Sequence, residues 1–334
     1  MEKTIAHPKT LQEAIKLFAD QDAALRFMVA LRWPDGVCCP RCGSVRVRFI
    51  STRRVWECRE DHKSKRFSVK TGTIMEESPL PLDKWLVAIW LEANAKNSIS
   101  SYEVHRALGI TQKSAWFMQQ RIRLALQSGS LTKLSGNVEV DESFIGGLSR
   151  NMHKDRRAKV ITKSGPGNKT PVMGLLERTS DKKCSRVIAC VVPNTKRDTL
   201  MPIIRSSVEP GAQVSTDSLH SYHGLKDDYI HGIVDHATEY VNGNVHTNGL
   251  ENFWSLFKRC IKGTHVSVEP FHLFRYLDAE CFRFNNREDN DGGRFNAAIK
   301  GINGKRLTYK SLTGCDPEGR YANGTGEADA NLGN

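Results

Sequence analysis

The chain has 334 residues, enough for two or three domains at roughly 100–200 residues each. Its 49 Lys and Arg exceed its 37 Asp and Glu, and the formal net charge of +12 favours a polyanionic partner such as nucleic acid. The longest strongly apolar run, residues 85–91, is far shorter than the ~20 residues of a spanning helix. The start of the chain also lacks the pattern of a signal peptide. We therefore expect no membrane association and a cytoplasmic location.

The first predicted elements are helical and are followed by a cysteine-rich segment. Apolar residues recur at helical spacing over residues 10–32, and Trp33-Pro34-Asp35-Gly36 ends that pattern. Four of the nine cysteines then fall between residues 38 and 58. In a reducing compartment, this clustering indicates metal ligation or burial in preference to disulfides.

The pair Cys39 and Cys42, three positions apart and followed by Gly43, is typical of a zinc knuckle. Cys58 and His62 supply a second pair, although their spacing is one residue longer than usual. A structural zinc ion takes four such ligands in a tetrahedron, so the sequence predicts a Zn²⁺ ribbon, with unligated cysteines as the alternative. The hairpin expected between the two pairs carries candidate DNA-binding residues: Arg46, Arg48, Arg53 and Arg54.

Helical periodicity returns over residues 82–126. Residues 98–111 indicate a helix, a turn at Gly109 and a new N-cap at Thr111, which is the outline of a helix-turn-helix motif. The second helix would present Arg121 and Arg123 to DNA. Two core helices joined by a glycine turn are an equally good interpretation.

The pattern becomes β-rich after residue 136. Strands are predicted at residues 138–144, 171–177, 186–192, 213–216 and 229–234, with helices at 197–206, 250–261 and 271–285. This order indicates a mixed α/β domain. A basic stretch at residues 150–169 includes Lys154, Arg156 and Arg157, and is either a solvated loop or a phosphate-binding one. The Gly-, Asn- and Asp-rich residues 304–334 are expected to form a disordered tail.

Acidic residues recur at the ends of the predicted strands. Strand alternation places Asp141 on the face opposite Val138 and Val140, and Asp217 ends a similar run. Glu251 lies in the first turn of a predicted helix, with Lys258 about two turns later on the same face. Carboxylates on neighbouring strands can bind Mg²⁺ or Mn²⁺ for a two-metal phosphoryl transfer. Turn residues and a helix cap at Asn248 are the ordinary alternatives, and spacing alone favours those.

Several short stretches match one known family when they are taken together. They lie at residues 31–36, 39–44, 67–74, 78–80, 140–143, 216–217, 246–259 and 282–287. Among them are Cys39-Pro40-Arg41-Cys42, Val140-Asp141-Glu142-Ser143 and Asn248-Gly249-Leu250-Glu251-Asn252-Phe253-Trp254. On these motifs the chain resembles the zinc-ribbon DDE transposases of bacterial insertion sequences.

This resemblance implies an RNase H-like catalytic fold that uses two Mg²⁺ or Mn²⁺ ions. It implies Asp141 and Asp217 as metal ligands, and Lys258 as the basic residue of the family. Family members differ over whether an acid or an asparagine fills the third position. Glu251 fits the spacing to the lysine, whereas Asn248 and Asn252 are the competing candidates.

The resemblance predicts a transposase that binds double-stranded DNA at transposon ends and at the target, as a homo-oligomer. It would recognise terminal inverted repeats, cleave DNA and join strands. The rivals are a non-catalytic zinc-ribbon regulator, or decayed transposase, and a nuclease without strand transfer. The expected division is a helical segment (1–36), the zinc ribbon (37–75), a helix-turn-helix-like region (76–135), the catalytic domain (136–303) and the tail (304–334).

Overall fold

The computed structural model forms two compact units: Met1–Ser128 with Asn286–Tyr309, and Gly129–Asn285 with Lys310–Asn334. The structure describes residues 7–127, 132–147, 154–155, 169–179, 184–217, 220–222, 224–234 and 246–314. None of the helices in these ranges combines the length and the apolar character that a bilayer crossing requires.

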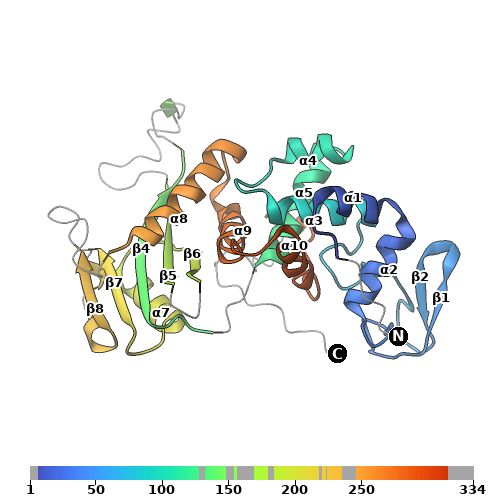
Figure 1. Cartoon of the computed structure of the whole chain (residues 1–334), viewed down its shortest axis with the longest axis horizontal. Helices are drawn as coiled ribbons and strands as arrows, with labels where there is room; N and C mark the ends of the chain where they lie inside the picture. Colours follow the sequence, from blue (N-terminus) through green and yellow to red (C-terminus); the bar gives the residue numbers. More distant parts are fainter. Residues whose placement is uncertain are drawn as a thin grey trace. The chain divides into compact units, whose positions relative to one another are not determined.

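The first unit is built mainly from helices around an aromatic core (Figure 1). Its helices are α1 (Leu11–Ala19), α2 (Gln21–Arg32), α3 (Leu82–Asn94), α4 (Ser101–Leu108), α5 (Gln112–Leu126) and α10 (Asp291–Lys300), and α11 (Tyr309–Leu312) spans the boundary between the units. Helix α3 is central, since α1, α5 and α10 all pack against it. The helical segments predicted before residue 33 and over 82–126 are therefore confirmed.

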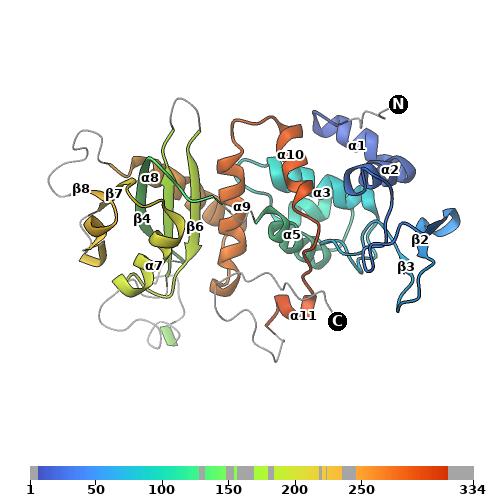
Figure 2. The same ribbon diagram turned by 90° about the horizontal axis from the view of Figure 1, so that it is seen from below.

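Residues 286–309 return from the far end of the sequence to complete this first unit. Helix α10 lies beside α3 (Figure 2) and inserts Phe295, which is fully buried, among the rings of Phe18, Phe27 and Trp90. The backbone adds a bridge between Thr73 and Asn303. Residues 286–303 were predicted to belong to the catalytic domain, and this aromatic packing places them in the first unit instead.

The prediction that a disordered tail begins at residue 304 is wrong, because residues just beyond this position make contacts with the first unit. Lys305 Nζ donates hydrogen bonds to the carbonyls of Leu124 and Gln127 at 3.0 and 2.8 Å, and Leu307 is buried. Lys305 thus ties this part of the chain to the C-terminal end of α5. The rest of the tail prediction, residues 315–334, lies outside the described residues.

The cysteine-rich segment folds as a small antiparallel sheet in the order β1-β2-β3. The strands are β1 (Val47–Ile50), β2 (Val55–Cys58) and β3 (Arg66–Phe67), with a 3-10 turn η1 (Ser51–Arg53) between the first two. Trp33, Trp56 and Phe67 pack their rings together beneath the strands, with centroids 5.6 to 6.1 Å apart. This aromatic contact and the cysteines form the core of a domain too small for a large apolar one.

Helices α4 and α5 form the predicted helix–turn–helix outline. Ser100 and Glu103 make a capping box at the start of α4, and Gly109 ends α4 in the left-handed conformation with φ of 59°. Thr111 then caps α5 through a bond from the amide of Ser114. The elements are confirmed, whereas DNA binding by this pair stays a prediction.

The second unit is a mixed α/β sheet with strand order β6-β5-β4-β7-β8. Its strands are β4 (Asn137–Ile145), β5 (Thr170–Glu177), β6 (Arg186–Val191), β7 (Gln213–Asp217) and β8 (Ile230–Val234). Strands β4, β5 and β6 run antiparallel, whereas β7 is parallel to both β4 and β8. All five predicted strands are confirmed.

Helices cover both faces of this sheet. They are α7 (Arg197–Ser207), α8 (Asn248–Arg259) and α9 (Leu273–Asn285). The 3-10 turns η3 (His220–Tyr222) and η4 (Leu225–Asp227) lie between β7 and β8, whereas the π-helical turn η5 (Cys260–His265) and the 3-10 turn η6 (Pro270–His272) lie between α8 and α9. Val138 and Val140 face α7, and the alternate face of the sheet packs on α8 and α9 (Figure 1). The second unit thus has three layers, and its mixed α/β character agrees with the predicted order of strands and helices.

Gly174 allows α8 to approach the sheet closely. It lies on β5 directly opposite Asp141 of β4. A Cβ at this position would meet the Trp254 ring at 2.7 Å and Leu250 at 2.8 Å, which is closer than real contacts allow. The missing side chain is therefore what lets Trp254 reach the strand that carries Asp141.

Candidate active site and zinc centre

The strand register brings Asp141 and Asp217 together. Strands β4 and β7 are paired as far as Glu139 and Ser215. Continuing that register by two residues places Asp217 beside Asp141, just beyond the last paired position. Both aspartates consequently lie where the two strands separate, at one edge of the hydrogen-bonded ladder. The sequence predicted this proximity, and the structure confirms it.

Glu142 joins these two aspartates, which the sequence did not predict. One ligand oxygen from each of Asp141, Glu142 and Asp217 lies within 4.8 Å of the others. Neighbouring residues of a strand normally face opposite sides, so alternation placed Glu142 away from Asp141. The hydroxyl of the buried Tyr222 donates a hydrogen bond to Glu142 and holds it at the cluster.

The electrostatics of this carboxylate cluster favour a bound cation. Burial and the neighbouring charge of Asp217 raise the pKa of Asp141 from 3.8 to about 6. Burial also raises the pKa of Glu142 from 4.5 to about 7, although the hydrogen bond from Tyr222 lowers it. Crowded, half-buried carboxylates resist ionisation unless a positive charge lies between them. Oxygen ligands of this kind fit Mg²⁺ or Mn²⁺.

Helix α8 borders the carboxylate cluster and is anchored to it. The indole Nε1 of Trp254 donates a hydrogen bond of 3.0 Å to Asp141 Oδ2. Glu251 and Lys258 are exposed on this helix. Besides burial and Asp217, the charge of Glu251 raises the pKa of Asp141, so the two carboxylates interact. Among the described residues, however, Glu251 is not part of the set that lies within ligand distance.

The expectation that Asn248 caps this helix is wrong. Asn248 is the first helical residue of α8 and its side chain is exposed, whereas Thr247 occupies the N-cap position without a side-chain cap bond. The amide of Leu250 in the first turn is instead bound by Glu139 of β4, at 2.9 Å. Glu139, which is distant in the sequence, therefore binds an amide at the start of α8, as the Asn248 side chain was expected to do.

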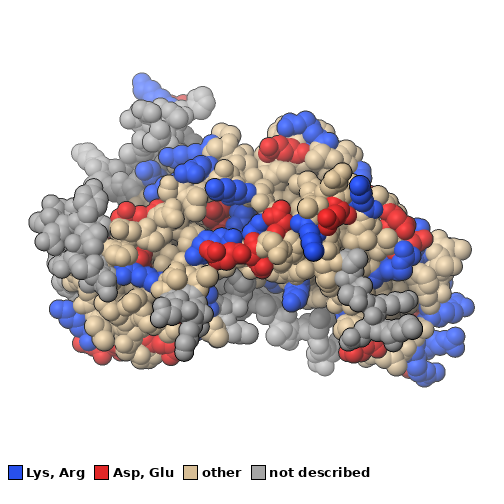
Figure 3. Space-filling view, in the orientation of Figure 1, with Lys and Arg blue, Asp and Glu red and all other residues tan. Residues whose placement is uncertain are grey.

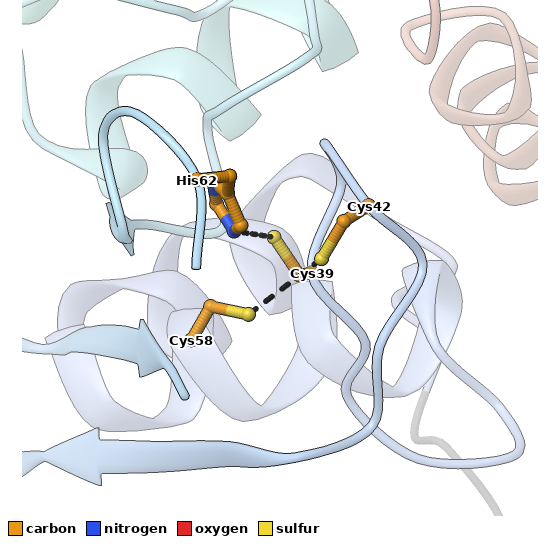
Figure 4. A group of neighbouring side chains, drawn as sticks. All are labelled: Cys39, Cys42, Cys58 and His62. Atoms are coloured by element: carbon orange, nitrogen blue, oxygen red, sulfur yellow. Dashed lines mark hydrogen bonds between the residues drawn. The ribbon is translucent and has the colours of Figure 1, made fainter. Parts of the chain in front are cut away.

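The four predicted zinc ligands lie together in the first unit (Figure 4). Cys42 Sγ is 3.6 Å from Cys58 Sγ, and Cys39 Sγ is 3.6 Å from His62 Nε2. A tetrahedral ion with Zn–S bonds of about 2.3 Å needs sulfur atoms about 3.8 Å apart, close to what is found. The side chains of Cys39, Cys42, Cys58 and His62 therefore fit one zinc ion.

The protonation states of these groups also suit a metal. His62 Nδ1–H donates to the carbonyl of Lys63 at 2.8 Å, which leaves Nε2 directed towards the sulfurs. Burial opposes ionisation of Cys39, but amide and thiol hydrogen bonds lower its pKa from 9.0 to about 7. Burial raises the pKa of Cys58, so Cys39 becomes a thiolate more readily than Cys58 does. Thiolates are the form that binds zinc.

Basic side chains surround the zinc ribbon. Arg46, Arg48, Arg53 and Arg54 are all exposed on or beside the β1–β2 hairpin. Lys and Arg side chains gather at the right edge of Figure 3, where Figure 1 places this hairpin. Surface carboxylates pair with three of them, as in the 2.8 Å contact between Arg48 and Glu57. Such exposed pairs are weak, so phosphate groups can compete for these arginines.

The two arginines predicted on the second helix of the helix–turn–helix outline are not available to DNA in this structure. Arg123 is 1% exposed and its Nε donates to Glu92 at 2.9 Å in the core. Arg121 is 5% exposed, lies over the rings of Trp85 and Phe117, and donates to the carbonyl of Glu76. Both side chains turn inward because α5 is buried along its second half.

The other predicted DNA-binding residues lie in the long basic segment between β4 and β5. Lys154 is exposed. Arg156 and Arg157 lie outside the described residues.

Comparisons with known proteins agree with this pair of sites. The ISXO2-like transposase domain matches residues 133–285, and the transposase zinc-ribbon domain matches residues 19–63. A protein of the transposable element ISH50 from Halobacterium salinarum is 28% identical over 291 residues, covering 82% of this chain and 96% of its own length. A transposase-like protein of Haemophilus influenzae is 39% identical over 108 residues, covering 32% of this chain and 85% of the relative. No solved structure matches the chain significantly. The chain belongs to the zinc-ribbon DDE transposases of insertion sequences, in the ISXO2-like group.

Proposed function

We propose that the protein binds the terminal inverted repeats of an insertion sequence and catalyses metal-dependent cleavage and joining of DNA strands. The observation that carries this proposal is the cluster of Asp141, Glu142 and Asp217 at the open edge between β4 and β7. Half-buried carboxylates with raised pKa values, such as Asp141 and Glu142, are typical of functional sites. Membership of the DDE transposase family supports the proposed class of reaction, the cleavage and joining of DNA strands.

We further propose that the catalytic domain is RNase H-like. Support comes from its five-stranded sheet, in which three antiparallel strands are followed by two parallel ones. Helices on both faces and acids at the ends of β4 and β7 agree with that architecture. We assign it residues 136–285, after a helical segment (1–36), the ribbon (37–75) and the helical region (76–135).

Asp141 and Asp217 would hold the catalytic ions, with Glu251 as the third ligand. Two Mg²⁺ or Mn²⁺ ions supply activation of the attacking water or 3′-hydroxyl and stabilisation of the leaving oxygen when they are bound there. Trp254 orients Asp141 through its indole N–H. Lys258 is exposed on the same helix and would attract a DNA phosphate to this edge of the sheet.

The zinc ribbon would serve binding and not chemistry, because four protein ligands leave a zinc ion no open position. Its exposed arginines favour double-stranded DNA at the transposon ends and at the target. Joining two ends requires two catalytic centres, so we propose a homo-oligomer on DNA, acting in the bacterial cytoplasm at the nucleoid.

The first test replaces each catalytic aspartate by asparagine. D141N and D217N should abolish cleavage and joining of a terminal-repeat duplex in Mg²⁺ or Mn²⁺, while binding of that duplex persists. The matched control is Asp228→Asn, which removes a surface carboxylate paired with Arg205 in the same unit and should leave activity unchanged. A D141N protein that still joins DNA would end the two-metal proposal.

A second test decides the third ligand. Glu251→Gln keeps the size of the side chain and removes the charge, so cleavage should fall by orders of magnitude. Asn248→Ala changes an exposed residue in the first turn of α8 and should have a small effect. If Asn248→Ala is inactive and Glu251→Gln is active, the third position belongs to Asn248.

The same assay separates the rival functions by its products. A zinc-ribbon regulator would bind the duplex and give neither cleaved nor joined DNA. A nuclease would release cleaved ends without a joined product.

A further inference from the structure

Glu139 is a buried carboxylate that no metal-binding role explains. It is 1% exposed, lies on β4 two residues before Asp141, and faces the same side of the sheet. Burying an ionised carboxylate is strongly unfavourable unless partners compensate for the lost water. The contacts of Glu139 therefore indicate what the charge is retained for.

The two oxygens of Glu139 bind different parts of the structure. Oε2 accepts a hydrogen bond of 2.9 Å from the amide of Leu250, in the first turn of α8. Oε1 accepts one of 2.7 Å from Nε of Arg178, which directly follows β5. Arg178 Nη2 also donates to the carbonyl of His246, two residues before the helix, at 2.5 Å. One ion pair thus fixes the main chain of α8 and of the segment entering it.

Capping by residues next to the helix does not explain how the start of α8 is held in place. The N-cap residue Thr247 makes no side-chain cap bond, and Asn248 lies inside the helix. A carboxylate from the sheet stabilises the positive end of α8 just as a local one would, but it also links the helix to β4. Gly249 packs tightly at this contact, since a Cβ there would lie 2.9 Å from Glu139 Oε2 and 3.1 Å from Leu176.

The link has a consequence for the carboxylate cluster. Glu251 follows Leu250 directly, so the bond from Leu250 to Glu139 sets where Glu251 stands relative to Asp141. Trp254, one turn later, makes the second attachment of the same helix to the same strand. We propose that Glu139, paired with Arg178, is a positioning residue that holds α8 in register with β4, so that the acids of the helix and the strand share one metal site. This inference rests on the proposed metal-dependent function.

The test compares two ion pairs of the same sheet. Glu139→Gln keeps an acceptor for the Leu250 amide and removes the charge that Arg178 requires. The matched control is Glu177→Gln, since Glu177 is also buried, pairs with Arg186 at 3.1 Å and accepts from the amide of Ser135. Within the described part of the chain, it makes no hydrogen bond or ion pair with α8. Both changes remove one paired carboxylate from β4 or β5, so a loss of general stability should affect both.

Four measurements are made on the full chain with zinc retained: DNA cleavage, Mn²⁺ binding, hydrogen exchange and DNA affinity. In Glu139→Gln we expect cleavage of the terminal-repeat duplex to fall about 10- to 100-fold, the range found for groups that orient metal ligands. Binding of Mn²⁺, followed by its electron paramagnetic resonance without DNA, should weaken within the same range. Hydrogen exchange of the first-turn amides of α8 should quicken in Glu139→Gln and not in Glu177→Gln, while DNA affinity stays within twofold.

Each result decides the proposal. Equal losses in the two variants, or unchanged Mn²⁺ binding and exchange in Glu139→Gln, would overturn the positioning role. Gly249→Ala provides a second variant that keeps the ion pair but forces the helix away from Glu139, and it should weaken Mn²⁺ binding in the same way. If wild type and Glu177→Gln neither bind Mn²⁺ nor cleave, the proposed function has failed, which is distinguishable from failure of this inference.

Discussion

Replacing Asp141 by asparagine should stabilise the protein in the absence of Mg²⁺ and Mn²⁺. Burial, and then the charge of Asp217, raise the pKa of Asp141 from 3.8 to about 6. The folded state therefore holds the proton of this carboxyl more tightly than the unfolded state does. The stability that protonation contributes is fully present below about pH 4 and is lost as the pH rises through about 6.

The magnitude follows from the two pKa values. The change from 3.8 to about 6 corresponds to about 3 kcal/mol of destabilisation by the ionised carboxylate above pH 7. An asparagine carries no charge, and its Oδ1 can still accept the hydrogen bond from Trp254. D141N should thus gain up to about 3 kcal/mol near pH 7.5, which raises the melting temperature by several degrees at roughly 2–4 °C per kcal/mol. The gain should shrink below pH 6 and vanish near pH 4.

The assay is thermal unfolding of wild type and D141N between pH 4 and 8, with zinc retained and with or without added Mn²⁺. Mn²⁺ should raise the melting temperature of wild type by mass action and have little effect on D141N. A variant that is less stable than wild type without Mn²⁺ near pH 7.5 would show that the carboxylate supports the fold. The repulsion inferred for the cluster would then be wrong.

Four further outcomes are expected. His62→Ala should lower the zinc content of the purified protein, measured by elemental analysis, and a variant with full zinc would show that another side chain is the fourth ligand. Gly174→Val should cost about 1–3 kcal/mol in denaturant unfolding, because its side chain would overlap the Trp254 ring; wild-type stability would mean that α8 moves freely on the sheet. Arg123→Ala should cost about 3–5 kcal/mol, as for a broken buried ion pair, without changing the salt dependence of DNA binding. Arg48→Ser should cost little stability, but it should reduce the slope of log DNA affinity against log salt concentration by about one. Equal slopes for the wild type and the variant would place Arg48 outside the DNA interface.

Local patterns were sufficient to predict the elements and the zinc ligands. Alternation around Val138 and Val140 predicted the faces of β4, since those residues do pack against α7. The cysteine spacing needed one hairpin to bring its two pairs together, and β1 and β2 provide it. In each case the partners are close in sequence, so few arrangements were possible.

The remaining features depend on contacts between distant residues. Glu142 reaches the carboxylate cluster because the pairing between β4 and β7 ends at Glu139. The hydrogen bond from Tyr222 then holds the Glu142 side chain there. The helical pattern alone predicts that Arg123 is exposed to solvent. The structure shows instead that Glu92 faces it in the core. Nothing in the residues around either side chain indicates the partner.

The packing of Phe295 ties the order of synthesis to the order of folding. The rings of Phe18, Phe27 and Trp90, to which it adds, are translated well before the sheet, whereas Phe295 emerges after it. At 5–20 residues per second, the helices of the first unit wait roughly 10 s or longer for this core residue. During that time an apolar surface on α1, α2 and α3 is uncovered. A chain cut short after residue 285 would keep that surface, so a frameshift inside the catalytic region would yield a fragment prone to aggregation instead of a free-standing DNA-binding module.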